Sequence, residues 1–230
     1  MTARLIGDVR RKNSHSSRRL ESSLVAFIGR MFWLGNRALS NRRDYAVPVW
    51  MVLSLAAERE VGFPKIARAL ELIGEYHPRT LARLRALADG VIVFDIPGTQ
   101  GSWLQAVRLV RLSEKHVLGA DTAPEHIAAT IAHEVAHAWL ISRGIKYSPD
   151  QRHRVEAFCY RSEAALARRL PGCEKLAEYY EATASRTVAN GPAPWSKERR
   201  IERDLRALEG LGVPGWMRSL LRRTAQRGSA

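Results

Sequence analysis

The chain has 230 residues, of which 46% are hydrophobic and 26% are charged, and its formal net charge is +14. This length is sufficient for a real hydrophobic core, and we expect one domain with additional segments at its ends. No stretch approaches the roughly 20 apolar residues that span a bilayer, and the basic start lacks the uninterrupted apolar region of a signal peptide. Two cysteines, Cys159 and Cys173, do not make a disulfide framework. We therefore expect a cytoplasmic protein with no disulfide-linked partner.

The positive charge is concentrated at the two ends of the chain. Residues 1–60 contain 11 Lys or Arg against 5 Asp or Glu, and residues 195–230 contain 9 against 4. The middle is nearly balanced, with 17 against 14. Basic ends favour an anionic partner such as nucleic acid, a membrane surface or an acidic protein. Arginines that are simply solvated on helix surfaces are the plainer interpretation.

The first part of the chain is predicted to be a disordered basic tail followed by helices. Residues 1–20 are polar and basic, which is typical of disorder. Residues 21–89 form a helical N-terminal region in this interpretation, because apolar residues recur there at helical spacing. The predicted helices are Ser22–Arg37, Val47–Arg59, Phe63–Ile73 and Arg79–Ala88. The stripe within Ser22–Leu39 could lie on a membrane surface or could pack onto the domain.

The composition changes at Gly90, where segments rich in β-formers begin. Gly90–Ile96 is apolar and ends at Pro97, Trp103–Leu112 alternates in part, and His116–Gly119 is a candidate third strand. These segments predict a small sheet ahead of the next helix. An edge strand of such a sheet can hold an extended peptide, and a sheet that only covers the helix is an equal alternative.

The most informative segment is Thr122–Ile141, which reads as one helix that begins at a Thr122 cap and stops at Gly144. Its polar exceptions are His133, Glu134 and His137. Two histidines four residues apart lie one turn from each other on the same face, so both imidazoles can reach a single metal ion. Burying three polar groups is costly unless they share a partner. The spacing therefore predicts a metal site in which Glu134 acts as a base toward water; two hydrogen-bonded histidines without a metal are the alternative.

Residues Thr130–Trp139 (TIAHEVAHAW) resemble the extended signature of the zincin metallopeptidases at every position. The resemblance implies zinc at His133 and His137, with Glu134 as the general base. It also implies an α+β, mostly helical fold in which a small sheet precedes the motif helix. The metzincin branch would require glycine and histidine where this chain has Leu140 and Arg143, so that branch is excluded.

A catalytic zinc keeps three protein ligands, and Glu156 is the strongest candidate for the third. It lies in a second helical run, Arg154–Leu170, and a glutamate on the helix after the turn resembles the gluzincin arrangement. The rivals are His153 and Asp150; the latter would follow the aspzincins, but their Gly-Thr-x-Asp motif is absent. The interpretation without a metal pairs Glu156 with Arg152.

Several neighbours of Glu156 are candidates for supporting roles. Cys159, Tyr160 and Glu163 share its helix face, and Glu163 could orient a ligand histidine by accepting its second N–H. Tyr160 or Tyr147 could donate a hydrogen bond to an oxyanion. Some gluzincins have an aspartate at the position of Tyr160, so that contact does not carry over to this chain.

The remainder of the chain is predicted to be helical. Gly172–Arg186 is one helix, and Asn190–Trp195 is a turn that ends the core, residues 90–190. Two basic amphipathic helices, Trp195–Glu209 and Pro214–Arg227, complete residues 191–230. The leading hypothesis is a zinc-dependent peptidase that acts on a peptide or protein substrate. The alternatives are a non-catalytic domain on the same scaffold that binds partners through its basic ends, and a binder of anionic surfaces in which the site is incidental.

Overall fold

The computed structural model describes residues 40–52, 54–94, 98–145, 147–148, 150–191, 205 and 214–227. Within these residues the fold is α+β and mostly helical. The strands are β1 (Ser40–Asp44), β2 (Pro48–Val52), β3 (Gly90–Phe94), β4 (Gly101–Leu104) and β5 (Leu109–Ser113). The helices are α2 (Ala56–Tyr76), α3 (Pro78–Leu87), α4 (Glu114–Leu118), α5 (Pro124–Ser142), α6 (Arg152–Ala167), α7 (Glu174–Ala189) and α9 (Gly215–Arg227).

The described strands form one mixed sheet in the order β1-β2-β3-β5-β4. The central strands β2, β3 and β5 run parallel, and β1 and β4 pair antiparallel with β2 and β5 at the two edges. All five residues of β3 and of β5 are buried. A strand buried on both faces carries apolar residues at consecutive positions, which is the usual pattern of parallel strands.

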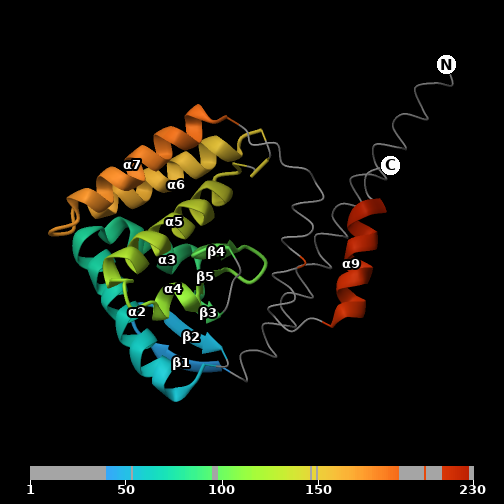
Figure 1. Ribbon diagram of the computed structural model, residues 1–230, viewed down its shortest axis with the longest axis horizontal. Coiled ribbons are helices and arrows are strands. Elements are labelled where there is room, and N and C mark those ends of the chain that lie inside the picture. The colour runs from blue at the N-terminus through green and yellow to red at the C-terminus, as the bar shows by residue number, and fades with distance from the viewer. Residues whose placement is uncertain are drawn as a thin grey trace.

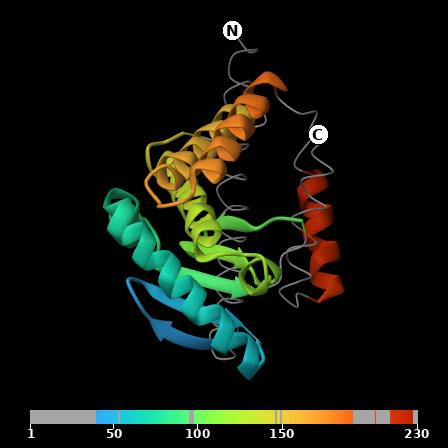
Figure 2. The ribbon, with the colours of Figure 1, turned by 60° about the vertical axis from the view of Figure 1, so that its left-hand side comes forward.

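One face of the sheet builds the main hydrophobic core against the helices. Val49, Val91 and Val110 point to this face and are fully buried with Ile66 of α2 and Ile131 of α5. Figure 1 shows α2, α3 and α5 gathered beside the sheet, and in Figure 2 α2 and α5 cross the same face of it. A second, smaller cluster (Trp50, Val52, Ile92, Phe94 and Leu109) lies on the other face.

Helix α5 is the element that connects the sheet to the remaining helices. It contacts α2, α3, β4 and β5 on one side and α6 on another, and α6 in turn packs along α7. Figure 1 shows the α6–α7 pair lying over α5. Because α5 is enclosed in this way, eleven of its residues are buried, including Glu134.

The prediction of a helix over Val47–Arg59 is wrong. Residues 48–52 form β2, which pairs with β1 and β3, and α2 begins only at Ala56. The run Val49–Val52 is apolar at every position because β2 is buried on both faces. It therefore shows neither the alternation of a half-buried strand nor the 3.6-residue spacing of an amphipathic helix. The sheet consequently contains strands from both sides of residue 90, which was the predicted start of the core.

Two predictions about the strands near the motif helix also need correction. His116–Gly119 is not a strand, since His116, Val117 and Leu118 lie in the short helix α4. Trp103–Leu112 is not one strand but the hairpin β4–β5. Its turn contains no glycine, and Arg108 adopts a positive φ of 53°. The Arg108 guanidinium donates to the carbonyl oxygens of Leu87 (3.0 Å) and Ala86 (3.2 Å) at the end of α3, which stabilises this conformation.

The other helix predictions are confirmed to within a few residues at most ends. The expected helices at 79–88, 122–141, 154–170, 172–186 and 214–227 correspond to α3, α5, α6, α7 and α9, and the expected helix 63–73 is the second half of α2. Ala123 rather than Thr122 is the N-cap residue of α5.

The predicted tail 1–20, the helix 22–37 and nearly all of 195–209 lie outside the described residues. Among the described helices none is long and apolar enough to cross a membrane.

We predict that Gly90→Ala is strongly destabilising. Gly90 has a φ of +156°, and a Cβ there would overlap the Pro48 carbonyl oxygen and the Trp50 ring of β2. Backbone strain and overpacking together should lower the free energy of unfolding by about 2–4 kcal/mol. The measurement is urea denaturation of the wild type and the variant.

Gly172→Ala is the matched control, since Gly172 has a φ of +72° but a Cβ added there would meet nothing within 4 Å. It should lose only about 1–2 kcal/mol, the cost of the left-handed conformation. Equal losses for both variants would contradict the close contact between β2 and β3.

Candidate metal centre

Two histidines of α5 lie together in a nearly closed site. The ring centroids of His133 and His137 are 4.9 Å apart, and their side chains are 11% and 13% exposed. The helical spacing of four residues brings the rings to the same face of α5, as the sequence predicts. That face is directed toward α6.

Glu156 of α6 brings a carboxylate oxygen to both imidazoles. Its Oε2 lies 3.3 Å from Nε2 of His133 and 3.7 Å from Nε2 of His137. An ion bound about 2.0–2.1 Å from each ligand atom in tetrahedral geometry separates two such atoms by about 3.3 Å. The two distances from Glu156 Oε2 are therefore close to the separation of two ligand atoms on one small cation.

Glu163 contacts the other nitrogen of the first histidine. Its Oε2 lies 3.1 Å from His133 Nδ1, so the contact expected from the sequence is present. Because His133 meets Glu163 while the later Trp139 stacks on the earlier Phe158, α5 and α6 run antiparallel. Burial alone lowers the pKa of His133, but the hydrogen bonds with Glu156 and Glu163 outweigh it and raise that pKa well above its usual value.

A tyrosine and an arginine hold the second oxygen of Glu156. The Tyr147 hydroxyl donates to Glu156 Oε1, and Arg152 Nε donates to the same hydroxyl at 2.8 Å. Arg152 Nε also lies 3.7 Å from Glu156 Oε1. Burial and the Glu156 charge raise the pKa of Tyr147, so the phenol stays protonated and remains a donor. Burial by itself raises the pKa of Glu156, but the hydrogen bonds with His133 and His137 prevail and lower it.

Glu134 lies between α5 and the edge strand β4. Its Oε1 is 3.2 Å from the position that a Cβ on Gly101 would occupy, so glycine leaves room for this carboxylate. The side chain is buried, with 5% exposed. Burial raises the pKa of Glu134, and the two neighbouring histidines and a hydrogen bond from the Trp103 backbone oppose this shift. A carboxylate with a raised pKa is suited to accept a proton near neutral pH.

Tyr160 and Cys159 also border the two histidines. The Tyr160 ring forms a T-shaped contact with the His133 ring, with centroids 5.0 Å apart, and burial raises the pKa of Tyr160 to about 12. The Cys159 sulfur lies within 4.8 Å of donor atoms of both histidines, and the group His133, His137 and Cys159 could hold a metal ion.

Glu156 and Cys159 thus offer alternative third donors. Glu156 Oε2 lies 3.3 Å and 3.7 Å from the two Nε2 atoms, and the Cys159 sulfur lies within 4.8 Å of donor atoms of both histidines. Cys159 is fully buried, and burial together with three nearby glutamates raises the pKa of its thiol, which disfavours the thiolate that binds metals. Cys159 was not predicted as a donor, although its position three residues after Glu156 puts it on the same face.

The two rivals for the third position do not reach the motif histidines. Asp150 is exposed in the turn before α6. His153 has its Nδ1 buried without a hydrogen-bond partner. Within the described part of the chain, neither has a hydrogen bond or ion pair to His133 or His137.

Compared with the models of known protein families and with curated protein sequences, the chain matches none of them.

We predict that the two cysteines differ sharply in reactivity. Cys159 is fully buried, while Cys173 is partly exposed at the start of α7. In the folded protein, iodoacetamide should alkylate Cys173 about 100-fold faster or more, since access and thiolate fraction control the rate. Mass spectrometry of timed samples measures both sites, and in denaturant the two rates should converge. Rapid alkylation of Cys159 in folded protein would contradict its burial.

Proposed function

We propose that the protein is a zinc-dependent hydrolase that cleaves peptide bonds. The observation that carries this proposal is the position of Glu156 Oε2, 3.3 Å and 3.7 Å from the Nε2 atoms of His133 and His137. Two imidazoles and one carboxylate are the ligand set of a common class of catalytic zinc sites, which leave one position open.

Zinc suits this donor set better than the other common divalent ions. Calcium and magnesium prefer six or more oxygen ligands, whereas two nitrogen donors and a single carboxylate oxygen favour zinc. A zinc ion held here would supply Lewis acidity toward a carbonyl group and toward water.

The side chains around the two histidines divide the remaining roles. Glu163 accepts from His133 Nδ1 and thereby turns Nε2 toward Glu156. Tyr147 and Arg152 occupy Glu156 Oε1, so that Oε2 faces the histidines. Glu134 is the general base that takes a proton from water and passes it to the leaving amine.

The edge strand β4 supports a peptide as the substrate. Among the described strands, β4 pairs with β5 on one side only. Its residues Gly101 and Trp103 adjoin the Glu134 carboxylate. An extended chain that adds to this edge by main-chain hydrogen bonds would run past the proposed base.

A second candidate is a non-catalytic domain with a structural metal. The observation that favours it is the burial of the site, in which Glu134 is 5% exposed and the two histidine side chains are 11% and 13% exposed. Burial of this degree leaves a substrate little access to a metal ion held by these residues. Zinc content together with an absence of hydrolysis would support this candidate.

We predict that the bound metal depends on Glu156 and not on Cys159. Wild-type protein dialysed against zinc should retain one equivalent, measured by mass spectrometry of the metal. Glu156→Gln should weaken zinc binding by about 100-fold or more, because a charged ligand is replaced by a neutral amide. Cys159→Ala should retain the metal with an affinity within a few-fold of wild type.

Competition with a chromogenic chelator gives the affinities, and thermal denaturation without metal verifies that each variant folds. The reverse pattern, with loss in Cys159→Ala only, would assign the third position to sulfur. A wild-type protein that retains no zinc would remove the basis of the proposed function.

We predict that Glu134→Gln abolishes hydrolysis while zinc stays bound. Loss of a general base should lower kcat/KM on a peptide library by about 10²–10⁴-fold. Glu125→Gln, in the first turn of the same helix, is the matched control and should retain activity. Equal activity of wild type and Glu134→Gln would exclude Glu134 as the base, and zinc-loaded wild type without activity would favour the non-catalytic candidate.

A further inference from the structure

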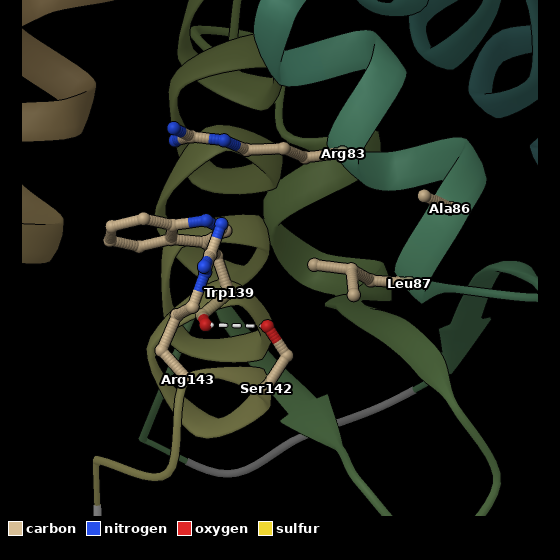
Figure 3. A pocket seen from close by; sticks show the side chains of 6 residues that line it. All are labelled: Arg83, Ala86, Leu87, Trp139, Ser142 and Arg143. Carbon is tan, nitrogen blue, oxygen red and sulfur yellow. Dashed lines mark hydrogen bonds between the residues drawn. The ribbon is translucent and has the colours of Figure 1, made fainter.

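A groove lies between α3 and the end of α5, on residues that the proposed zinc site does not use. Its volume is approximately 530 Å³, within the roughly 300–1,000 Å³ of small-molecule sites. The lining side chains, shown in Figure 3, are Arg83, Ala86, Leu87, Trp139, Ser142 and Arg143. The groove thus combines an apolar part with two cationic side chains.

The two arginines converge on one indole ring. The guanidinium carbon of Arg83 lies 4.5 Å from the Trp139 ring centroid, and that of Arg143 lies 5.7 Å from it. In Figure 3 both guanidinium groups lie beside this indole, although Arg83 comes from α3 and Arg143 from the C-terminal end of α5. The indole itself stacks on Phe158 of α6, with centroids 5.7 Å apart and planes inclined by 15°. Trp139 is therefore a fixed support for both cations.

Stacking on an aromatic face leaves the donors of a guanidinium available. The five N–H groups lie in the plane of the guanidinium group and point outward from its edge. There they match the oxygens of a carboxylate or phosphate. A guanidinium already held against an indole also loses less conformational entropy when it binds.

The donors of these two arginines are not used within the described structure. Among the described residues, none forms a hydrogen bond or ion pair with the guanidinium group of Arg83 or of Arg143, and no carboxylate lines the groove. Neighbouring arginines behave differently, because Arg85 donates to the Ala46 carbonyl and Arg108 to those of Leu87 and Ala86. Helix α3 also contains no acidic residue. The positive charge of the groove is thus left without a counter-charge in this part of the chain.

We propose that this groove binds a small organic anion through the guanidinium groups of Arg83 and Arg143. The shared chemistry of its ligands is a carboxylate or phosphate group joined to an apolar body that lies against Ala86 and Leu87. The indole already contacts Phe158 and Arg83, so recognition rests on charge and shape rather than on stacking of a ligand ring.

The groove is separate from the metal centre on the same helix. Trp139 lies two residues after His137, which is more than half a turn around α5. The histidines face Glu156 and Glu163, whereas Trp139 meets α3 and Phe158. No residue is common to the two sites, so the proposal stands apart from the proposed hydrolase activity.

Calorimetric titration of the full chain with two probes, phenyl phosphate and phenylacetate, tests this proposal. Both probes have an apolar ring and differ in their anionic group, so the tighter one identifies the preferred oxyanion. Wild type should bind at least one probe at one equivalent, and excess chelator should not change the affinity. Arg83→Gln/Arg143→Gln should bind at least 10-fold more weakly.

Arg161→Gln/Arg186→Gln is the control, since it removes the same charge from exposed positions on α6 and α7 and should bind within 2-fold of wild type. Arg83→Lys/Arg143→Lys keeps the charge but not the planar fork, so it should bind with an intermediate affinity. This variant tests the proposal if the double glutamine variant fails to fold. Absence of saturable binding to wild type, an equal loss in the control, or loss of binding with chelator would overturn the proposal.

Discussion

The pairing of charged side chains between α5 and α6 is the constraint on which the rest of the site depends. Burying an unpaired charge costs several kcal/mol, yet this interface contains His133, His137, Glu156 and Glu163. Glu156 contacts both imidazoles, and Glu163 contacts the second nitrogen of His133. Carboxylates outnumber the imidazoles once Glu134 is included, and burial raises the pKa of Glu134 and of Glu163. Excess negative charge in a closed space is the condition that a divalent cation relieves.

The sequence was sufficient to predict this pairing because its determinants are local. A four-residue spacing fixes two histidines on one helix face whatever surrounds them, and Glu163 follows Glu156 by two turns on the next helix. The choice of Glu156 over Asp150 and His153 rested on the resemblance to the gluzincin arrangement of two helices joined by a turn. In the structure Glu156 Oε2 lies 3.3 Å and 3.7 Å from the two Nε2 atoms. Apolar residues that recur at helical spacing likewise predicted α3, α5, α6 and α7.

The remaining features were not predictable because they depend on contacts between distant segments. Strand β2 looked helical, since a strand covered on both faces has no alternation to distinguish it. The β4–β5 turn could not be predicted because it contains no glycine. Arg108 takes the left-handed conformation instead, and contacts with Asp89 and with the end of α3 stabilise it. The same limit applies to Tyr147 and Arg152, whose joint contact with Glu156 depends on how the loop before α6 folds back. The convergence of Arg83 and Arg143 on Trp139 likewise requires α3 and α5 to be adjacent.

Helix α5 therefore separates two environments of opposite electrostatic character. On the side facing α6, buried carboxylates surround two imidazoles and favour a cation. On the side facing α3, two guanidinium groups without a described counter-charge favour an anion. Phe158 links these sides, because it stacks on Trp139 and lies two residues beyond Glu156 on α6. No residue belongs to both sites, so each side of α5 selects its ligand by the charge of its own side chains.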